Sequence, residues 1–185
     1  MIFQDYYSTP GVRETCHQMK EGDGYLREKA ITKAAIYLAQ EGGINSTCYL
    51  IPAPQHSGRA LYTKDLCEKI AHLTGACVLD IVRCHPHDAM YEQKQERPGC
   101  LPEAEFFLEG FIPEDGTLLF IDNVISTGET FNRINVLFGG ALLPMPYAVD
   151  YTRLADEKIL ALLKSQKELR HPAKRKKNAA KHKTR

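Results

Sequence analysis

Residues 122–130, Asp-Asn-Val-Ile-Ser-Thr-Gly-Glu-Thr, combine two acids with three hydroxyl side chains and a glycine. Gly128 allows the backbone to turn sharply and approach a ligand, while Ser126, Thr127 and Thr130 offer hydroxyl donors. Asp122 adds a negative charge, which suits a sugar phosphate whose hydroxyls or bound Mg²⁺ the acid would hold. The segment therefore predicts a site for a phosphate and its sugar.

The flanking elements place this segment where anions bind. The apolar run from Leu118 to Ile121 predicts a buried strand. After Thr130 the apolar residues follow helical spacing, at Phe131, Ile134, Leu137 and Phe138, and Gly139-Gly140 predicts the end of the helix. Backbone N–H groups and the helix dipole favour an anion at such a strand-to-helix junction. An ordinary turn of an α/β protein, which favours the same residue types, is the alternative interpretation.

The segment resembles the 5-phosphoribosyl 1-diphosphate (PRPP) motif of type I phosphoribosyltransferases, in which an apolar strand leads to two acids and a hydroxyl-rich glycine turn. Asp122 matches the first acid, and Asn123 stands where the second is expected. The resemblance implies that Asp122 and Asn123 hold the ribose hydroxyls, with Mg²⁺ at Asp122. It also implies that the turn from Ser126 through Thr127, Gly128 and Glu129 to Thr130 wraps the 5′-phosphate.

A second loop is expected to face the same ligand. A strand is predicted from Thr47 to Ile51, and the loop Pro52 to Arg59 follows it. Ligands of parallel sheets bind at the carboxyl ends of the strands, so both loops should share one edge. The Pro-x-Pro segment that leads to an Arg resembles the competence-type members of the family. That resemblance implies diphosphate contacts from His56, Ser57, Gly58 and Arg59, with Arg59 assisting catalysis.

The remaining pattern alternates strands with helices. Helices are predicted over Asp23–Gln40, over Lys64–Leu73 with Thr63 as the N-cap, and over Thr152–Leu163; further strands are predicted over Ala76–Val82 and Ala141–Val149. This order predicts an α/β protein with a parallel sheet covered on both faces. The resemblance specifies it as a three-layer Rossmann-like sheet of the type I phosphoribosyltransferase fold.

The segment from Arg83 to Glu103 is polar, contains prolines and lacks periodicity, which is typical of a functional loop. It corresponds in order to the loop that closes over the site in this family, so that Arg83, Lys94 or Arg97 would reach the departing pyrophosphate. A solvated linker is the alternative. Cys84-His85-Pro86-His87 and Cys100 contain metal-binding groups, but their spacing matches no familiar zinc pattern.

The last 22 residues differ in charge from the rest of the chain. Lys164 to Arg185 contains ten Lys or Arg and one acid, a net of about +9, which leaves about −8 for residues 1–163. Without apolar periodicity this segment is predicted to be a disordered basic tail attached to a domain of residues 1–163. Such a tail could neutralise nucleic-acid phosphates. A solubilising terminus is the alternative.

Composition sets the broad class. The 185 residues are 43% hydrophobic and 25% charged, which is typical of a soluble globular protein, and no apolar run reaches the length of a membrane helix. A cytoplasmic protein with reduced cysteines is expected. A homodimer is compatible with the sequence.

The predicted function is transfer of the phosphoribosyl group of PRPP, with Mg²⁺, to a purine, pyrimidine or amine. The alternative is a catalytically weak PRPP-binding regulator or DNA-handling protein.

Overall fold

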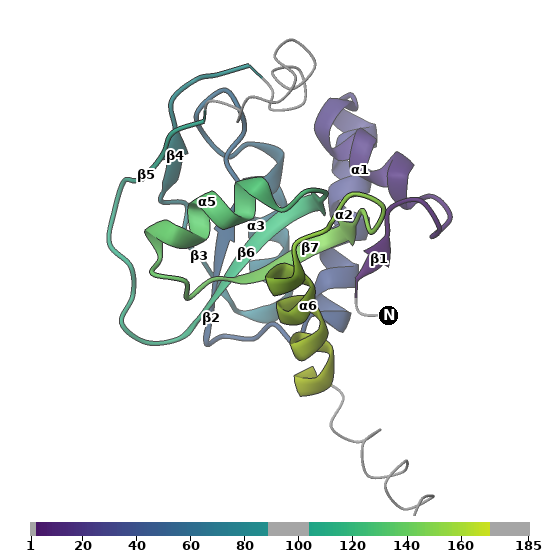
Figure 1. Ribbon diagram of the computed structural model, residues 1–185. Coiled ribbons are helices and arrows are strands. Elements are labelled where there is room, and N and C mark those ends of the chain that lie inside the picture. Colours follow the sequence, from purple (N-terminus) through teal and green to yellow (C-terminus); the bar gives the residue numbers. More distant parts are fainter. Residues whose placement is uncertain (1–2, 89–103, 171–185) are drawn as a thin grey trace, which may run out of the picture.

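A five-stranded parallel sheet flanked by helices forms the centre of the protein (Figure 1). The computed structural model describes residues 3–88 and 104–170. The strands, in spatial order, are β1 (Gln4–Asp5), β7 (Leu143–Val149), β6 (Thr117–Ile125), β2 (Cys48–Pro52) and β3 (Cys77–Val78). The helices are α1 (Val12–Glu21), α2 (Gly24–Glu41), α3 (Tyr62–Thr74), α5 (Glu129–Leu137) and α6 (Glu157–Arg170). The predicted α/β class is confirmed, and the sheet is compatible with a Rossmann-like fold.

The helices form two layers. In Figure 1, α2 and α3 lie behind the sheet with α1 beside them, while α5 and α6 lie in front. The start of α2 agrees with its sequence signal, because the Asp23 carboxylate accepts a hydrogen bond from the Leu26 N–H at 3.0 Å as an N-cap. The sheet is thereby covered on both faces, which is why its central strands are apolar on both.

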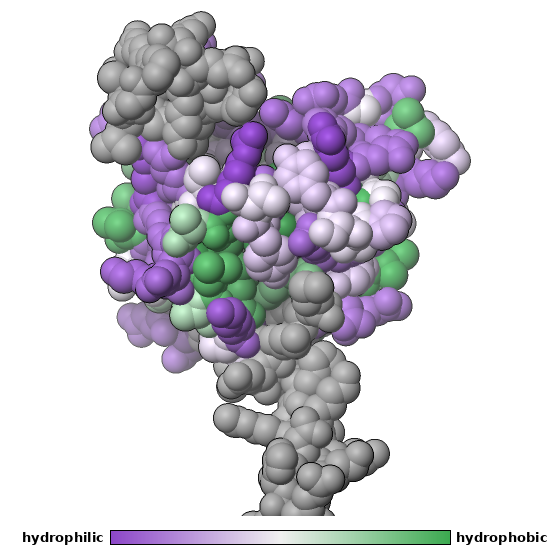
Figure 2. Space-filling view, turned by 45° about the vertical axis from the view of Figure 1, so that its right-hand side comes forward, coloured by the Kyte–Doolittle hydropathy of each residue, from purple (hydrophilic) through white to green (hydrophobic). Residues whose placement is uncertain are grey.

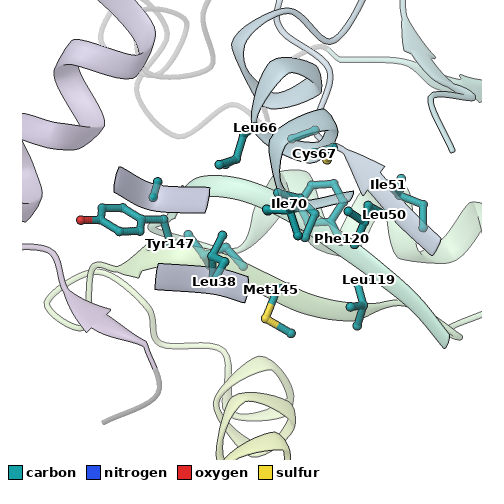
Figure 3. Packing of buried hydrophobic residues seen from close by; sticks show 14 of the residues in the cluster. Leu38, Leu50, Ile51, Leu66, Cys67, Ile70, Leu119, Phe120, Met145 and Tyr147 are labelled. Carbon is teal, nitrogen blue, oxygen red and sulfur yellow. The ribbon is translucent and has the colours of Figure 1, made fainter. Parts of the chain in front are cut away.

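The core lies mainly between the sheet and the α2–α3 layer, as Figure 3 shows. Ile70 of α3 lies next to Phe120 of β6, and Leu38 of α2 lies near Met145 of β7; all four are buried. Phe120 also contacts Phe131 of α5 with ring centroids 5.7 Å apart, so its strand connects both layers. Truncation of such a residue costs about 3–5 kcal/mol, because the cavity left behind closes only partly.

The strand order has a switch point between β2 and β6. From β2 the chain passes through α3 to β3 on one side, and later returns to β6 on the other side of β2. Neighbouring loops at the carboxyl ends of β2 and β6 therefore diverge, which leaves a crevice where ligands of open α/β sheets bind. The two loops that the sequence analysis selected both begin at this crevice.

The single strand predicted over Ala76–Val82 is wrong. Only β3 pairs with β2, and the chain then leaves the main sheet to form an antiparallel pair from β4 (Val82–Cys84) and β5 (Phe106–Leu108). Arg83 on β4 forms ion pairs with Asp80 at 2.7 Å and with Glu109 at 2.8 Å. The placement of Arg83 in a loop without secondary structure is therefore also wrong. Residues 89–103, with Lys94 and Arg97, lie outside the described residues.

Two predicted helix boundaries need correction. Helix α3 begins at Tyr62, and Thr63 is no N-cap; its hydroxyl lies in the first turn and donates to the Ala53 carbonyl at 2.6 Å. Helix α6 begins after Asp156, whose carboxylate accepts from the Lys158 and Ile159 N–H groups at 2.9 and 3.1 Å.

Helix α6 also continues to Arg170, past the predicted domain end at Leu163. Gln166, which the sequence analysis assigned to the tail, is 2% exposed and donates to the Pro144 carbonyl of β7 at 2.9 Å. A side chain anchored in this way cannot belong to a disordered segment. Residues 171–185 of the predicted tail lie outside the described residues.

The surface is mainly polar. Figure 2 shows one face, on which polar residues in purple border a smaller apolar patch in green. Isolated apolar surface of this kind is normal in folded proteins. No helix in the described part of the chain combines the length and the apolar character needed to cross a membrane.

Candidate functional site

A cleft of about 540 Å³ opens at the switch point of the sheet. Pairing of β6 with β2 ends at Ile121 and Pro52, whereas pairing with β7 continues to Ile125. The last four residues of β6 therefore border β7 alone within the sheet, and the cleft lies beside them. Asp122 and Asn123 are strand residues, although the sequence analysis ended the strand before Asp122.

The cleft brings together part of the predicted site. Four predicted residues line it, namely His56, Asp122, Asn123 and Thr130. The other seven are not among its lining residues, namely Ser57, Gly58, Arg59, Ser126, Thr127, Gly128 and Glu129. These seven belong to the same two loops as His56 and Thr130, so each loop reaches the cleft with only part of its predicted residues.

Asp122 supplies a carboxylate to the cleft wall. One of its oxygens accepts a hydrogen bond from the Asn123 N–H at 2.7 Å. Burial raises the pKa of Asp122 to about 7, against the opposing effects of backbone hydrogen bonds and of the Lys20 charge. A buried carboxyl group with a raised pKa can bind a cation, because the cation would stabilise its charged form. It can also form a hydrogen bond with a ligand hydroxyl.

Asn123 is 7% exposed and its amide is engaged with three partners. Its side-chain oxygen accepts from the Val124 N–H at 2.9 Å and from the Tyr62 hydroxyl at 3.3 Å. Its side-chain nitrogen donates to the Cys16 carbonyl at 3.3 Å. This amide can offer a ribose only its second N–H, so the predicted ribose contact is much reduced.

The turn before α5 has a structural role beside its predicted phosphate role. Gly128 has φ +79° and precedes the first residue of α5, with no side chain capping the helix. A Cβ at Gly128 would collide with Cδ1 of Ile159 on α6. Glycine is therefore required both by the left-handed backbone and by the close helix. Thr130, in the first turn of α5, is one of the residues that line the cleft.

The loop after β2 is held by its own backbone. The Gln55 N–H donates to the Arg59 carbonyl at 3.0 Å, and the Gly58 N–H donates to the Gln55 carbonyl at 2.9 Å. The Gly58 carbonyl in turn accepts from the Cys84 N–H of β4 at 3.0 Å. His56 and Arg59 are exposed on this loop. Their backbone is thus fixed before any ligand arrives.

Another wall of the cleft comes from residues that the sequence analysis did not select. Tyr6, His17, Lys20 and Glu21 line it from the N-terminal segment and α1, and the Tyr6 hydroxyl lies 3.1 Å from His17 Nε2. The signal for α1 was present, because Val12, Thr15, Cys16 and Met19 form a buried stripe at helical spacing.

Asp122 fits the expected Mg²⁺. Magnesium is usually bound through one or two carboxylates plus the phosphates of its ligand, so a single acid facing a phosphate-binding cleft is a sufficient protein donor. Among residues 3–88 and 104–170, no three His, Cys, Asp or Glu side chains form a group that could hold a metal ion. Cys100, named above with His85 and His87, lies outside these ranges.

Comparison of the chain with protein-family models gave no match, and comparison with curated proteins gave none either. Functional inference therefore rests on the cleft and on residues 122–130.

Proposed function

We propose that the cleft binds PRPP with Mg²⁺ and that the protein transfers the phosphoribosyl group to a nitrogenous acceptor such as a nucleobase. One observation carries this proposal: the loop after β2 and the segment 122–130 on and after β6 meet at one cleft at the switch point of the sheet. The finer fold that goes with it is that of the type I phosphoribosyltransferases.

The start of α5 suits the 5′-phosphate. The Gly128 turn presents the amino end of the helix, whose dipole favours an anion, and Thr130 adds a hydroxyl at the cleft. Ser126 and Thr127 lie on the same turn and would complete the phosphate contacts. Glu129 lies 3.2 Å from Arg133, which offsets its charge near the bound phosphate.

The loop after β2 suits the diphosphate. His56 lines the cleft, and the exposed Arg59 can form a bidentate pair with a phosphate. The departing pyrophosphate gains negative charge in an oxocarbenium-like transition state, so a cation carried on this held loop would stabilise that state. Mg²⁺, bound through Asp122 and the ligand's phosphates, would supply further neutralisation of the leaving group.

The wall formed by α1 suits the acceptor. His17 and Glu21 can exchange hydrogen bonds with a polar ring edge, and Tyr6 can contact a flat ring. These groups line the same cleft as Asp122 of β6, beside which the ribose would be held. The acceptor nitrogen would then approach C1 of the ribose from the side opposite the diphosphate.

A pyrophosphate-release assay tests the proposal. Protein, PRPP and Mg²⁺ are incubated with each common nucleobase in turn, and released pyrophosphate is measured. We expect release with one or a few bases, and its loss in Arg59→Met, which keeps the length of the side chain without its charge. Release that requires no acceptor, or that Arg59→Met does not reduce, would contradict the proposed transfer.

A PRPP-binding regulator is the second candidate, and the state of Asn123 favours it. That residue brings no charge to the site, and its amide is engaged with protein groups. A regulator would bind PRPP without releasing pyrophosphate from any base. Contact with nucleic acid through residues 171–185 would be an additional property, which a salt-dependent gel shift would detect.

A further inference from the structure

The Asn123 amide has a single allowed orientation. The Val124 N–H can only donate, so it requires the amide oxygen, and the Cys16 carbonyl can only accept, so it requires the amide nitrogen. The Cys16 thiol returns a contact to the Asn123 carbonyl at 3.5 Å. With Tyr62 included, the network joins α1, α3 and β6 at one buried point.

We propose that Asn123 is a positioning residue whose amide fastens α1 to β6 and so sets the position of the α1 wall over Asp122. The inference deepens the proposed function, and only its ligand-binding part rests on that function. The fastening itself is a property of the protein alone, because every group in the network belongs to the chain.

The hydrogen-bond network of Asn123, called the anchor below, is connected to the cleft through one turn of α1. Cys16 and Lys20 are four residues apart on α1, which places them on the same face, and both line the cleft. The Lys20 charge acts on Asp122, where it opposes the effect of burial on the pKa of that carboxyl. A displacement of α1 at Cys16 would therefore move the Lys20 cation relative to Asp122.

The network also explains why an amide stands at this position. Aspartate would keep both acceptor contacts, but it would turn a second oxygen toward the Cys16 carbonyl in place of the donor now 3.3 Å away. Its charge would be buried at a position that is 7% exposed, adjacent in the chain to Asp122. Restoring the acid pair of the resembled family should thus loosen α1 rather than improve the site.

Alkylation of Cys16 measures the anchor without any ligand. Cys16 is 2% exposed in the native protein, and Cys48 and Cys67, at 5% and 0%, provide buried controls in the same molecule. The measurement compares wild type, Asn123→Asp and Tyr62→Phe by iodoacetamide labelling and mass spectrometry. Tyr62→Phe removes a single hydroxyl, so it gives a result even where Asn123→Asp fails to fold.

We expect Cys16 to react about tenfold faster in Tyr62→Phe, as the loss of one buried hydrogen bond implies, and faster still in Asn123→Asp, while Cys48 and Cys67 keep their rates. Unchanged labelling of Cys16 in the folded variants would overturn the proposal. An equal rise at all three cysteines would overturn it as well, because it would show that Asn123 stabilises the whole fold.

A double-mutant cycle tests the consequence for the cleft. PRPP affinity with Mg²⁺ is measured for wild type, Lys20→Met, Asn123→Asp and the double variant. We expect Lys20→Met to weaken binding severalfold in wild type and to have a much smaller effect in Asn123→Asp. Additive effects would overturn the proposed positioning of Lys20. If wild type does not bind PRPP, the proposed function fails, and the Cys16 labelling alone decides whether the anchor exists.

Discussion

Replacing Asp122 with Asn should stabilise the metal-free protein at neutral and higher pH. The folded state raises the pKa of Asp122 from 3.8 to about 7, because burial disfavours the charged carboxylate. A raised pKa means that the stability associated with the protonated form is present in full below about pH 4 and is lost as the pH rises through about 7. Asparagine is neutral throughout, and its oxygen can keep the Asn123 N–H contact.

The size of the effect follows from the shift. A change of about three pKa units corresponds to roughly 4 kcal/mol, which is an upper limit because Asp122 lines a water-accessible cleft. We therefore expect Asp122→Asn to be more stable than wild type by about 1–3 kcal/mol near pH 8, and nearly equal to it near pH 4.

Urea denaturation from about pH 4 to pH 8 in EDTA is the assay. Asp156→Asn is a matched control: hydrogen bonds from Asn132 and the α6 backbone lower the pKa of Asp156, so this variant should lose stability by a nearly constant amount across the assayed range. Its contribution to stability is present above the ordinary aspartate range and is lost as the pH falls through the lowered pKa. A difference between wild type and Asp122→Asn that is flat across this range would refute the argument from burial.

Three further outcomes are expected. Gly128→Ala should destabilise the fold by about 2–4 kcal/mol in thermal or urea unfolding, because a left-handed φ is combined with a collision at Ile159. Gly139→Ala, with φ +61° and open space around it, should cost only about 1–2 kcal/mol, and an equal cost for both would contradict the packing argument. Thr130→Val should weaken PRPP binding by about 1–3 kcal/mol in calorimetry on the folded variant, and equal affinity would remove Thr130 from the phosphate site. Deletion of residues 171–185 should abolish any salt-dependent nucleic-acid gel shift and leave PRPP affinity unchanged; loss of PRPP affinity would place that segment at the cleft instead.

The strongest sequence signals were local. The strand before Asp122 could be predicted because it is a continuous apolar run, and the helix after Thr130 because its apolar residues follow helical spacing. The segment 76–84 could not, because only its first part has β2 as a neighbour. Its second part pairs with β5, more than 20 residues later in the chain. Which partner a short apolar run selects is a long-range property that periodicity does not contain.

In the candidate site, too, local features could be predicted from the sequence and long-range contacts could not. Asp122 and Thr130 could be selected because one motif contains both. The role of Asn123 depends on Tyr62 and Cys16, which lie 61 and 107 positions away in the sequence. Lys20 reaches the cleft only because α1 packs beside α2 and β6. Contacts of this kind follow from the fold, so sequence spacing cannot predict them.

Calorimetric titration of the wild-type protein with PRPP, in the presence and absence of Mg²⁺, tests the central claim most directly. From the positions of Asp122 and the start of α5, we expect saturable binding of one PRPP per chain. Mg²⁺ should strengthen this binding through the carboxylate at the cleft. Asp122→Asn should retain the PRPP site and lose most of the Mg²⁺ dependence. Absence of saturable binding to the folded wild type under both conditions would contradict the assignment of this cleft to PRPP.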